Sequence, residues 1–279
     1  MILIVASTKD VAGMNIANSL VDYYRFEKTA DKFHENPIHF KSVEGQEVKL
    51  VFINEEIIQT QFITDCFSPE LVVFVSRHSS ERGIPTLSVH TPGNLTDKAE
   101  FGGVPKKVSV SPASAMKDCL AEMKRLKDEL RLDYEVSYEC THHGPSLDVP
   151  AMFAELGSSP SQWKDLNAAE AVAQAVMYAI HGQAKRSEYK AVLGIGGPHY
   201  NDKFTKFALG SKYAFGHIIP KYAVGQVDYD MVKQCVDRCA EKVDSIVLDW
   251  KGIKSADKET LKTILNKILK GSEDEISKI

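Results

Sequence analysis

Histidine is the side chain in this sequence with the most chemistry to offer, because it titrates near neutrality and binds metal ions. Six of the nine histidines fall where a predicted strand gives way to a loop. Glycine or proline accompanies nearly every one, which indicates backbone shaped closely around something. Because the carboxyl ends of parallel strands share one edge of a sheet, we expect these imidazoles to converge on a single cleft there. The six are His78, His90, His142, His143, His199 and His217.

The adjacent pair His142 and His143 sets a geometric condition. Neighbouring side chains of an extended chain point to opposite sides, so the turn at Gly144–Pro145 must rotate one ring if both are to face one ligand. Glu155, followed by a leucine, a glycine and two serines, could orient an imidazole, ligate a metal or bind an amine. The alternative for Glu155 is a solvated glutamate beside serines that cap the next helix.

A glycine-rich turn, Gly194-Ile-Gly-Gly197, follows a predicted strand and precedes a short predicted helix. Backbone N–H groups in such a turn can hold a phosphate or an oxyanion. His199 stands in place of the third glycine of a dinucleotide-binding fingerprint, and the Lys-Ser/Thr of a P-loop is absent. The glycine signal is therefore weak by itself.

The composition restricts the class of protein. The 279 residues are 43% hydrophobic and 26% charged with a net charge of −4, which excludes a disordered chain and a strongly basic nucleic-acid-coating protein. The apolar run Met1–Ala6 is too short for a signal sequence or a membrane span. Five scattered cysteines are typical of free thiols in a reducing compartment. We therefore expect a cytoplasmic protein without a membrane or DNA partner.

Short β-rich runs alternate with amphipathic helices, which is typical of βαβ units. We expect an α/β protein with three layers, α/β/α, around a mixed, largely parallel sheet, with residues 1–279 forming a single domain. The polar, irregular segment 28–47 is either a surface excursion or a small insertion. Predicted strands are 1–6, 48–54, 71–76, 85–89, 134–140, 191–194, 215–220 and 245–248, and 151–156 is ambiguous; predicted helices include 11–24, 167–182, 202–209 and 261–269.

Helix boundaries can be predicted from capping residues. Asp10 is the expected N-cap of the first helix, and Ser111–Pro112 should open another with a cap and a proline at the first position. Asn167 should cap the alanine-rich helix, and Gly182 should end it. The charged tail after Gly271 is expected to fray.

Five strings, taken together, resemble one known family. Nearly the whole chain is similar to the archaeal and plant type of D-aminoacyl-tRNA deacylase. One departure is a proline before His199 where the family has a third glycine, and it removes an amide donor from the glycine turn. The strings are Ser76-Arg-His78, His90-Thr-Pro-Gly-Asn94, Thr141-His-His-Gly-Pro145, Glu155-Leu-Gly-Ser-Ser159 and Gly-Gly-Pro-His199-Tyr200.

The resemblance implies a mixed α/β fold similar to nucleoside phosphorylases and peptidyl-tRNA hydrolases. It implies a tRNA charged with a D-amino acid as substrate, free tRNA and the D-amino acid as products, and zinc as an associated metal. We predict catalytic roles and zinc ligation for His78, His142, His143 and Glu155. The predicted substrate-binding residues are His90, Asn94, Gly144, Gly196, Gly197, His199, Tyr200 and His217.

Hydrolysis of an aminoacyl ester needs an activated water and donors for the developing oxyanion. A histidine base, a zinc-bound water or the ribose 2′-hydroxyl could supply the first, and N–H groups around Gly144 or Gly196 the second. A clash at the α-carbon would reject L-amino acids while tolerating many D side chains. The alternatives are a nucleoside phosphorylase-like transferase and a non-catalytic tRNA-binding module. The overall acidity of the chain disfavours the binding module.

Overall fold

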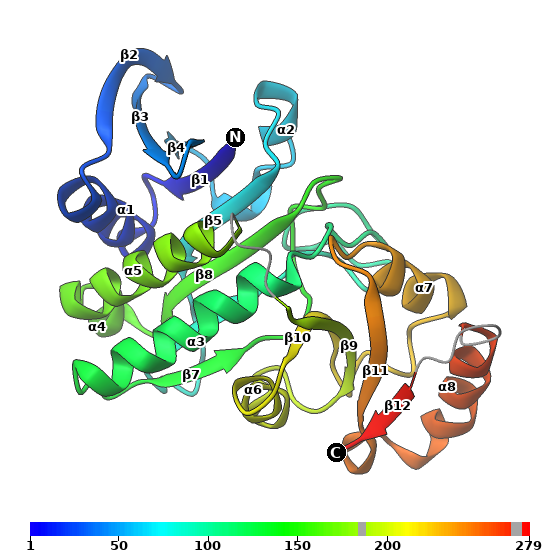
Figure 1. The fold of residues 1–279 in the computed structure, drawn as a ribbon. Helices are drawn as coiled ribbons and strands as arrows, with labels where there is room; N and C mark the ends of the chain where they lie inside the picture. Colours follow the sequence, from blue (N-terminus) through cyan, green and yellow to red (C-terminus); the bar gives the residue numbers. More distant parts are fainter. Residues whose placement is uncertain (184–187, 269–274) are drawn as a thin grey trace.

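The computed structural model describes residues 1–183, 188–268 and 275–279 (Figure 1). Its strands are β1 (Ile2–Ser7), β2 (Glu27–Phe33), β3 (Asn36–Val43), β4 (Gln46–Ile53), β5 (Leu71–Arg77), β6 (Thr86–His90), β7 (Glu135–Tyr138), β8 (Ala151–Gly157), β9 (Lys190–Gly196), β10 (Tyr213–Ile219), β11 (Val243–Asp249) and β12 (Glu275–Lys278). Its helices are α1 (Val11–Tyr24), α2 (Ile63–Cys66), α3 (Ala113–Glu129), α4 (Pro160–Trp163), α5 (Leu166–Gln183), α6 (Asp202–Leu209), α7 (Tyr229–Asp237) and α8 (Ser255–Ile268), with short 3₁₀ turns η1 (Ile57–Gln59) and η2 (Trp250–Gly252).

These strands form two sheets within the described residues. The larger has the order β2-β3-β4-β1-β5-β8-β6-β7, and the smaller has the order β10-β9-β11-β12. Strand β1 pairs in parallel with β4 and β5, and β5 pairs in parallel with β8, whereas β6 runs antiparallel to β8. The predicted α/β class with a mixed, largely parallel sheet is confirmed.

Different elements pack against the two faces of the larger sheet. Along β1, Ile2, Ile4 and Ala6 face one core cluster while Leu3 and Val5 face another, as the two-residue period of a strand requires. The first cluster lies under α1, α3 and α5, which pack against one another (Figure 1). The second lies under η1, α2 and the segment around Leu147. In the described part of the chain, no helix is long and apolar enough to cross a membrane.

Two segments were wrongly expected to be irregular. Residues 28–47 mostly form β2 and β3, an antiparallel pair that continues the larger sheet at its edge. Of the charged tail, residues 275–278 form β12, which pairs in parallel with β11, while 271–274 lie outside the described residues. Strand β2 is solvated on both faces, so its sequence lacks the apolar alternation from which a strand is predicted.

The N-cap of α1 is as predicted, because the Asp10 carboxylate accepts a 2.9 Å hydrogen bond from the Gly13 amide. The expectation for α3 is wrong. Pro112 itself occupies the N-cap position, and its side chain offers no acceptor. The Glu241 carboxylate, 127 residues further along the chain, accepts from the Ser114 amide at 2.8 Å instead. A cap supplied by a distant segment cannot be read from local sequence.

The residues predicted to cap the two ends of α5 are also wrong. Asp165 Oδ1 accepts hydrogen bonds from the amides of Asn167 and Ala168, at 3.0 and 3.1 Å, so Asp165 is the capping residue. Gly182 lies inside the helix, which continues to Gln183. A Cβ on Gly182 would lie 2.4 Å from Asp118 Oδ2, so this glycine serves the close packing of α5 on α3.

The corrected cap predicts a stability difference. Asp165→Ala should lower the free energy of unfolding by about 1 kcal/mol, because two helix amides lose their acceptor. Asn167→Ala, on an exposed position of the same turn, should change it by only a few tenths of a kcal/mol. Urea unfolding followed by circular dichroism measures both. The larger loss in Asn167→Ala would restore the cap expected from the sequence.

Candidate active site

A cleft of about 760 Å³ opens next to the ends of β5, β7, β8 and β9. Four of the six singled-out histidines line it, together with two buried carboxylates and several aromatic rings. The chemically active side chains of its wall are His78, His142, His143, His199, Glu139, Glu155, Tyr200 and Tyr222.

The histidines converge as expected, but the route differs from the predicted one. Because β6 runs antiparallel to β8, its last residue His90 lies opposite Phe153, in the interior of β8, and not at the carboxyl edge of that strand. The His90 ring stacks on Phe153 with centroids 4.9 Å apart and lies 4.3 Å from the His142 ring. His90 therefore forms the floor beneath the histidines that line the cleft.

His142 and His143 reach the same side of the chain by a backbone twist. His143 has a φ of +41°, in the left-handed region that a histidine rarely adopts. This twist interrupts the extended backbone, and the two rings lie with centroids 4.2 Å apart. The predicted rotation is therefore present, and it occurs at His143 itself.

His78 occupies the centre of a carboxylate pair. Its Nδ1 lies 3.2 Å from Glu139 Oε1 and 3.5 Å from Glu155 Oε2, and all three side chains are buried. Ser76 donates a 2.6 Å hydrogen bond to Glu155 Oε1. The backbone at His78 is fixed by Trp163, whose indole N–H donates to the His78 carbonyl at 2.8 Å.

The second oxygen of Glu139 binds His199 on the opposite side. His199 Nε2 donates to Glu139 Oε2 at 2.8 Å. Its Nδ1 lies 3.1 Å from Cys140 Sγ and 3.2 Å from the Tyr222 hydroxyl. Glu139 thus bridges two imidazoles and sets the charge of both.

Burial and ion pairing compete in this network. Burial lowers the pKa of His78, but Glu139 and Glu155 outweigh it and raise this pKa to about 10. Burial likewise opposes protonation of His199, yet the bonds to Cys140 and Glu139 raise its pKa to about 10. Burial and the neighbouring charge of Glu139 raise the pKa of Glu155 to about 7. At neutral pH the cleft therefore contains two cationic imidazoles and one carboxyl poised to exchange a proton.

The other three imidazoles are neutral. Burial, with the charges of neighbouring histidines, lowers the pKa of His90 and His142 well below the usual value, and burial lowers that of His143 to about 4. His142 Nδ1 donates to the Cys140 carbonyl and His143 Nδ1 to the Gly144 carbonyl, each at 2.8 Å. Both Nε2 lone pairs remain available, and neither ring nitrogen of His90 has a hydrogen-bond partner among the described residues.

Within the described residues, three groups have ligand atoms close enough to share one metal ion. The four predicted zinc ligands do not make one of these groups. His78 and Glu155 group with Glu139, whereas His142 and His143 group with His90. The third group combines Cys140, His142 and His199.

Three of the predicted substrate-binding residues lie outside the cleft wall and make contacts within the protein. His217 Nε2 donates to the Arg238 carbonyl at 2.9 Å and its Nδ1 accepts from Thr141 Oγ1 at 3.1 Å, away from the cleft wall. Asn94 donates to the Gly102 carbonyl at 2.8 Å. The Gly144 amide, expected near an oxyanion, donates to the Phe101 carbonyl at 2.9 Å.

The glycine turn also lies outside the cleft wall. Gly196 and Gly197 have φ values of +104° and +75°, and a Cβ on Gly197 would lie 2.3 Å from Asn201 Nδ2. These glycines turn the chain tightly after β9 and so deliver His199 and Tyr200 to the cleft. The Tyr200 ring meets the His78 ring edge-on, with centroids 5.1 Å apart.

Glu139, Cys140 and Tyr222 line or adjoin the cleft but were not predicted from the sequence as site residues. A usable signal existed for two of them, since Glu139 and Cys140 directly precede the Thr141-His-His string at a predicted strand end. A carboxylate, a thiol and an imidazole close together in the sequence indicate a site that could bind a metal ion or transfer protons. Tyr222 carried no comparable signal.

Comparisons with known proteins identify the family of this chain. A family model described as D-aminoacyl-tRNA deacylase matches residues 66–269. A protein named D-aminoacyl-tRNA deacylase from Pyrococcus abyssi is 38% identical over 95% of this chain and 97% of its own length, and one from Methanocaldococcus jannaschii is 33% identical over 92% of each. A crystal structure titled as a conserved protein of unknown function superposes with a TM-score of 0.86 at 30% identity, covering 100% of this chain and 95% of that one. The chain belongs to the D-aminoacyl-tRNA deacylase family.

Proposed function

We propose that this protein hydrolyses the ester bond between a D-amino acid and the terminal ribose of tRNA, releasing free tRNA and the D-amino acid. Membership of the family supports the reaction. The observation that carries the proposal is the shared cleft, in which a cationic imidazole and a carboxyl with a pKa of about 7 lie side by side. Those are the two groups that ester hydrolysis requires, a donor and a proton acceptor.

Glu155 is the proposed proton acceptor. Ser76 donates to its Oε1 at 2.6 Å, whereas its Oε2 lies 3.5 Å from His78 Nδ1, so Oε2 is the less tightly bonded oxygen and is the proposed acceptor of a proton from the attacking water. A carboxyl with a pKa near the working pH combines adequate basicity with a large ionised fraction. The glutamate-cap alternative does not apply, because Glu155 is buried within β8.

His78 is the proposed donor to the developing oxyanion. Its Nδ1 faces the two carboxylates, and its buried Nε2 has no hydrogen-bond partner among the described residues. A preorganised N–H in a partly desolvated cleft stabilises negative charge more strongly than water does. Glu139 acts through His78 and His199 by holding both rings in their charged form.

For zinc, we propose His90, His142 and His143 as the ligands. The fit rests on three neutral rings whose ligand nitrogens lie within 4.8 Å of one another, two of which are oriented by backbone carbonyls, as zinc-binding histidines are. Burying the two ring nitrogens of His90 without a hydrogen-bond partner lowers the stability of the fold unless a ligand or metal binds them. His78 and His199 suit metal binding less, because their protons are held by carboxylates. A zinc ion there would supply a Lewis acid that lowers the pKa of a bound water.

The direct test compares D-tyrosyl-tRNA with L-tyrosyl-tRNA. The D ester should be cleaved on the order of 100-fold faster, because the wrong hand places its side chain against the wall of the site. Loss of radiolabelled tyrosine from tRNA, corrected for spontaneous hydrolysis, gives both rates. Equal rates would remove the chiral part of the proposal, and no rate above background would remove the activity.

A further inference from the structure

Two aromatic side chains that line the cleft are unusually exposed to solvent. Phe101 is 65% exposed and Tyr222 is 52% exposed, and both line the cleft that contains His78 and Glu155. The Phe101 side chain has no polar atom that could form a hydrogen bond with water, so its exposure is unfavourable. An exposed ring of this kind beside a polar cleft is typical of a surface that binds another flat ring.

The loop that carries Phe101 is held rigidly. The Gly144 amide donates to the Phe101 carbonyl at 2.9 Å, and Asn94 donates to the next carbonyl, that of Gly102, at 2.8 Å. Gly102 has a φ of +75°, and a Cβ there would lie 2.0 Å from the Ile58 carbonyl oxygen. Glycine is therefore required at this position, and these contacts fix the backbone from which the Phe101 side chain projects.

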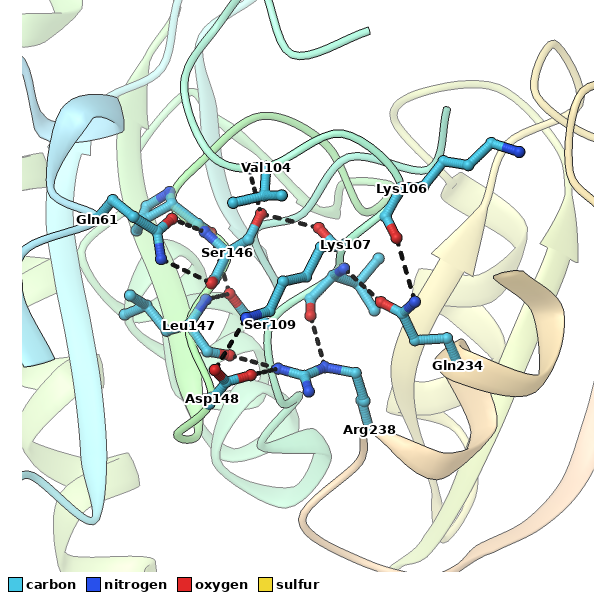
Figure 2. A network of polar contacts seen from close by, with 12 residues as sticks. Gln61, Val104, Lys106, Lys107, Ser109, Ser146, Leu147, Asp148, Gln234 and Arg238 are labelled. Atoms are coloured by element: carbon cyan, nitrogen blue, oxygen red, sulfur yellow. Dashed lines mark hydrogen bonds and ion pairs between the residues drawn. The ribbon is translucent and has the colours of Figure 1, made fainter. Parts of the chain in front are cut away.

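A polar network braces the chain that follows this loop (Figure 2). Ser146 Oγ accepts from the Val104 amide at 3.0 Å and donates to the Lys107 carbonyl at 2.8 Å. Gln61 binds the backbone of Ser146 on both its amide and its carbonyl, at 2.8 and 2.9 Å. The backbone that carries Phe101 is thus held in place, which reduces the entropy that a bound partner would have to offset.

Tyr222 is anchored at its other end. Its hydroxyl lies 3.2 Å from His199 Nδ1 and 3.3 Å from Cys140 Sγ, so the polar tip is fixed in the active-site network. The apolar part of the ring remains half exposed along the cleft. Two exposed rings on the wall of one cavity, one of them anchored by its hydroxyl, provide the arrangement in which a nucleobase stacks on protein aromatic side chains.

We propose that Phe101, assisted by Tyr222, is the stacking surface for the adenine of the 3′-terminal nucleotide of the substrate. This inference rests on the proposed function, since the reacting ester is carried by the ribose of that same nucleotide. A cavity of about 760 Å³ is within the range that holds a ligand of aminoacyl-adenosine size. Stacking on an apolar ring adds affinity without touching the ester, so Phe101 is a positioning residue and not a catalytic one.

The test uses 3′-deoxy-3′-(D-tyrosylamino)adenosine, in which an amide replaces the ester and resists hydrolysis. Phe101→Ala should weaken its binding by about 10-fold by calorimetry, and Phe101→Trp should retain wild-type affinity because it restores a stacking face. With D-tyrosyl-tRNA as substrate, Phe101→Ala should raise KM about 10-fold while changing kcat less than twofold. The matched control is Tyr178→Ala, which removes a 51% exposed ring on α5 away from the cleft wall.

Wild-type affinity of Phe101→Ala for the amide would overturn the inference, as would an equal loss in Tyr178→Ala or no binding by the wild type. A loss of affinity in Phe101→Ala that tryptophan does not rescue would also reject stacking. The binding assay does not depend on turnover. A wild type that binds the amide through Phe101 but does not cleave D-tyrosyl-tRNA would reject the proposed function and leave the stacking surface in place.

Discussion

Replacing Glu155 with glutamine is expected to lower kcat for D-aminoacyl-tRNA hydrolysis by on the order of 100-fold or more. Glutamine has nearly the same shape, and its carbonyl can still accept the hydrogen bond from Ser76. It cannot take a proton from water, so the change removes proton transfer while leaving the packing within β8. Single-turnover hydrolysis of D-tyrosyl-tRNA, with spontaneous loss subtracted, measures the effect.

The pH dependence separates proton transfer from a merely structural role. Because Glu155 acts in its ionised form, the wild-type rate should rise with pH through about 7 and then level off. The residual rate of Glu155→Gln should lack this rise. Glu135→Gln, at an exposed position of β7, is the matched control and should retain the wild-type profile. A rising limb of unchanged midpoint in Glu155→Gln would assign the titration to another group.

Much of the fold could be predicted from periodicity, because core-facing elements display it. The helices over Val11–Tyr24 and Asp202–Leu209 have the predicted bounds, since each buries one apolar stripe and begins at a side-chain cap. The polar edge strand β2 was missed because neither of its faces is buried. The caps of α3 and α5 were missed because they depend on Glu241, which is remote in sequence, and on Asp165, which lies one residue before the helix.

The site was predictable by residue type but not by grouping. Five of the six histidines at predicted strand ends meet around the cleft, as expected from the loops that carry them. Their partners depend on the direction of β6 relative to β8 and on the left-handed backbone of His143, and neither is encoded in a local pattern. The predicted ligand set therefore combined members of two groups, one that contains Glu139 and one made of three imidazoles.

Because the predicted ligands fall into two groups, substitutions in the two groups should affect the zinc content differently. His143→Ala should remove most of the zinc from a protein that otherwise retains about one ion per chain, because three imidazoles are the fewest that hold a zinc ion tightly. His78→Ala should retain the zinc yet lose activity, since His78 belongs to the carboxylate cluster. Elemental analysis after dialysis gives the stoichiometry independently of turnover, and His181→Ala on α5 is the control.

Chelation tests whether the activity of the wild-type protein depends on the ion. Removing the ion should abolish most of the activity, and adding zinc back should restore it, while circular dichroism reports whether the fold survives.

If His78→Ala loses zinc as completely as His143→Ala, the ligands are the four residues predicted from the sequence, His78, His142, His143 and Glu155. If His143→Ala retains its full zinc content, the ion is held elsewhere, and the neutral imidazoles of the cleft are free to act as bases.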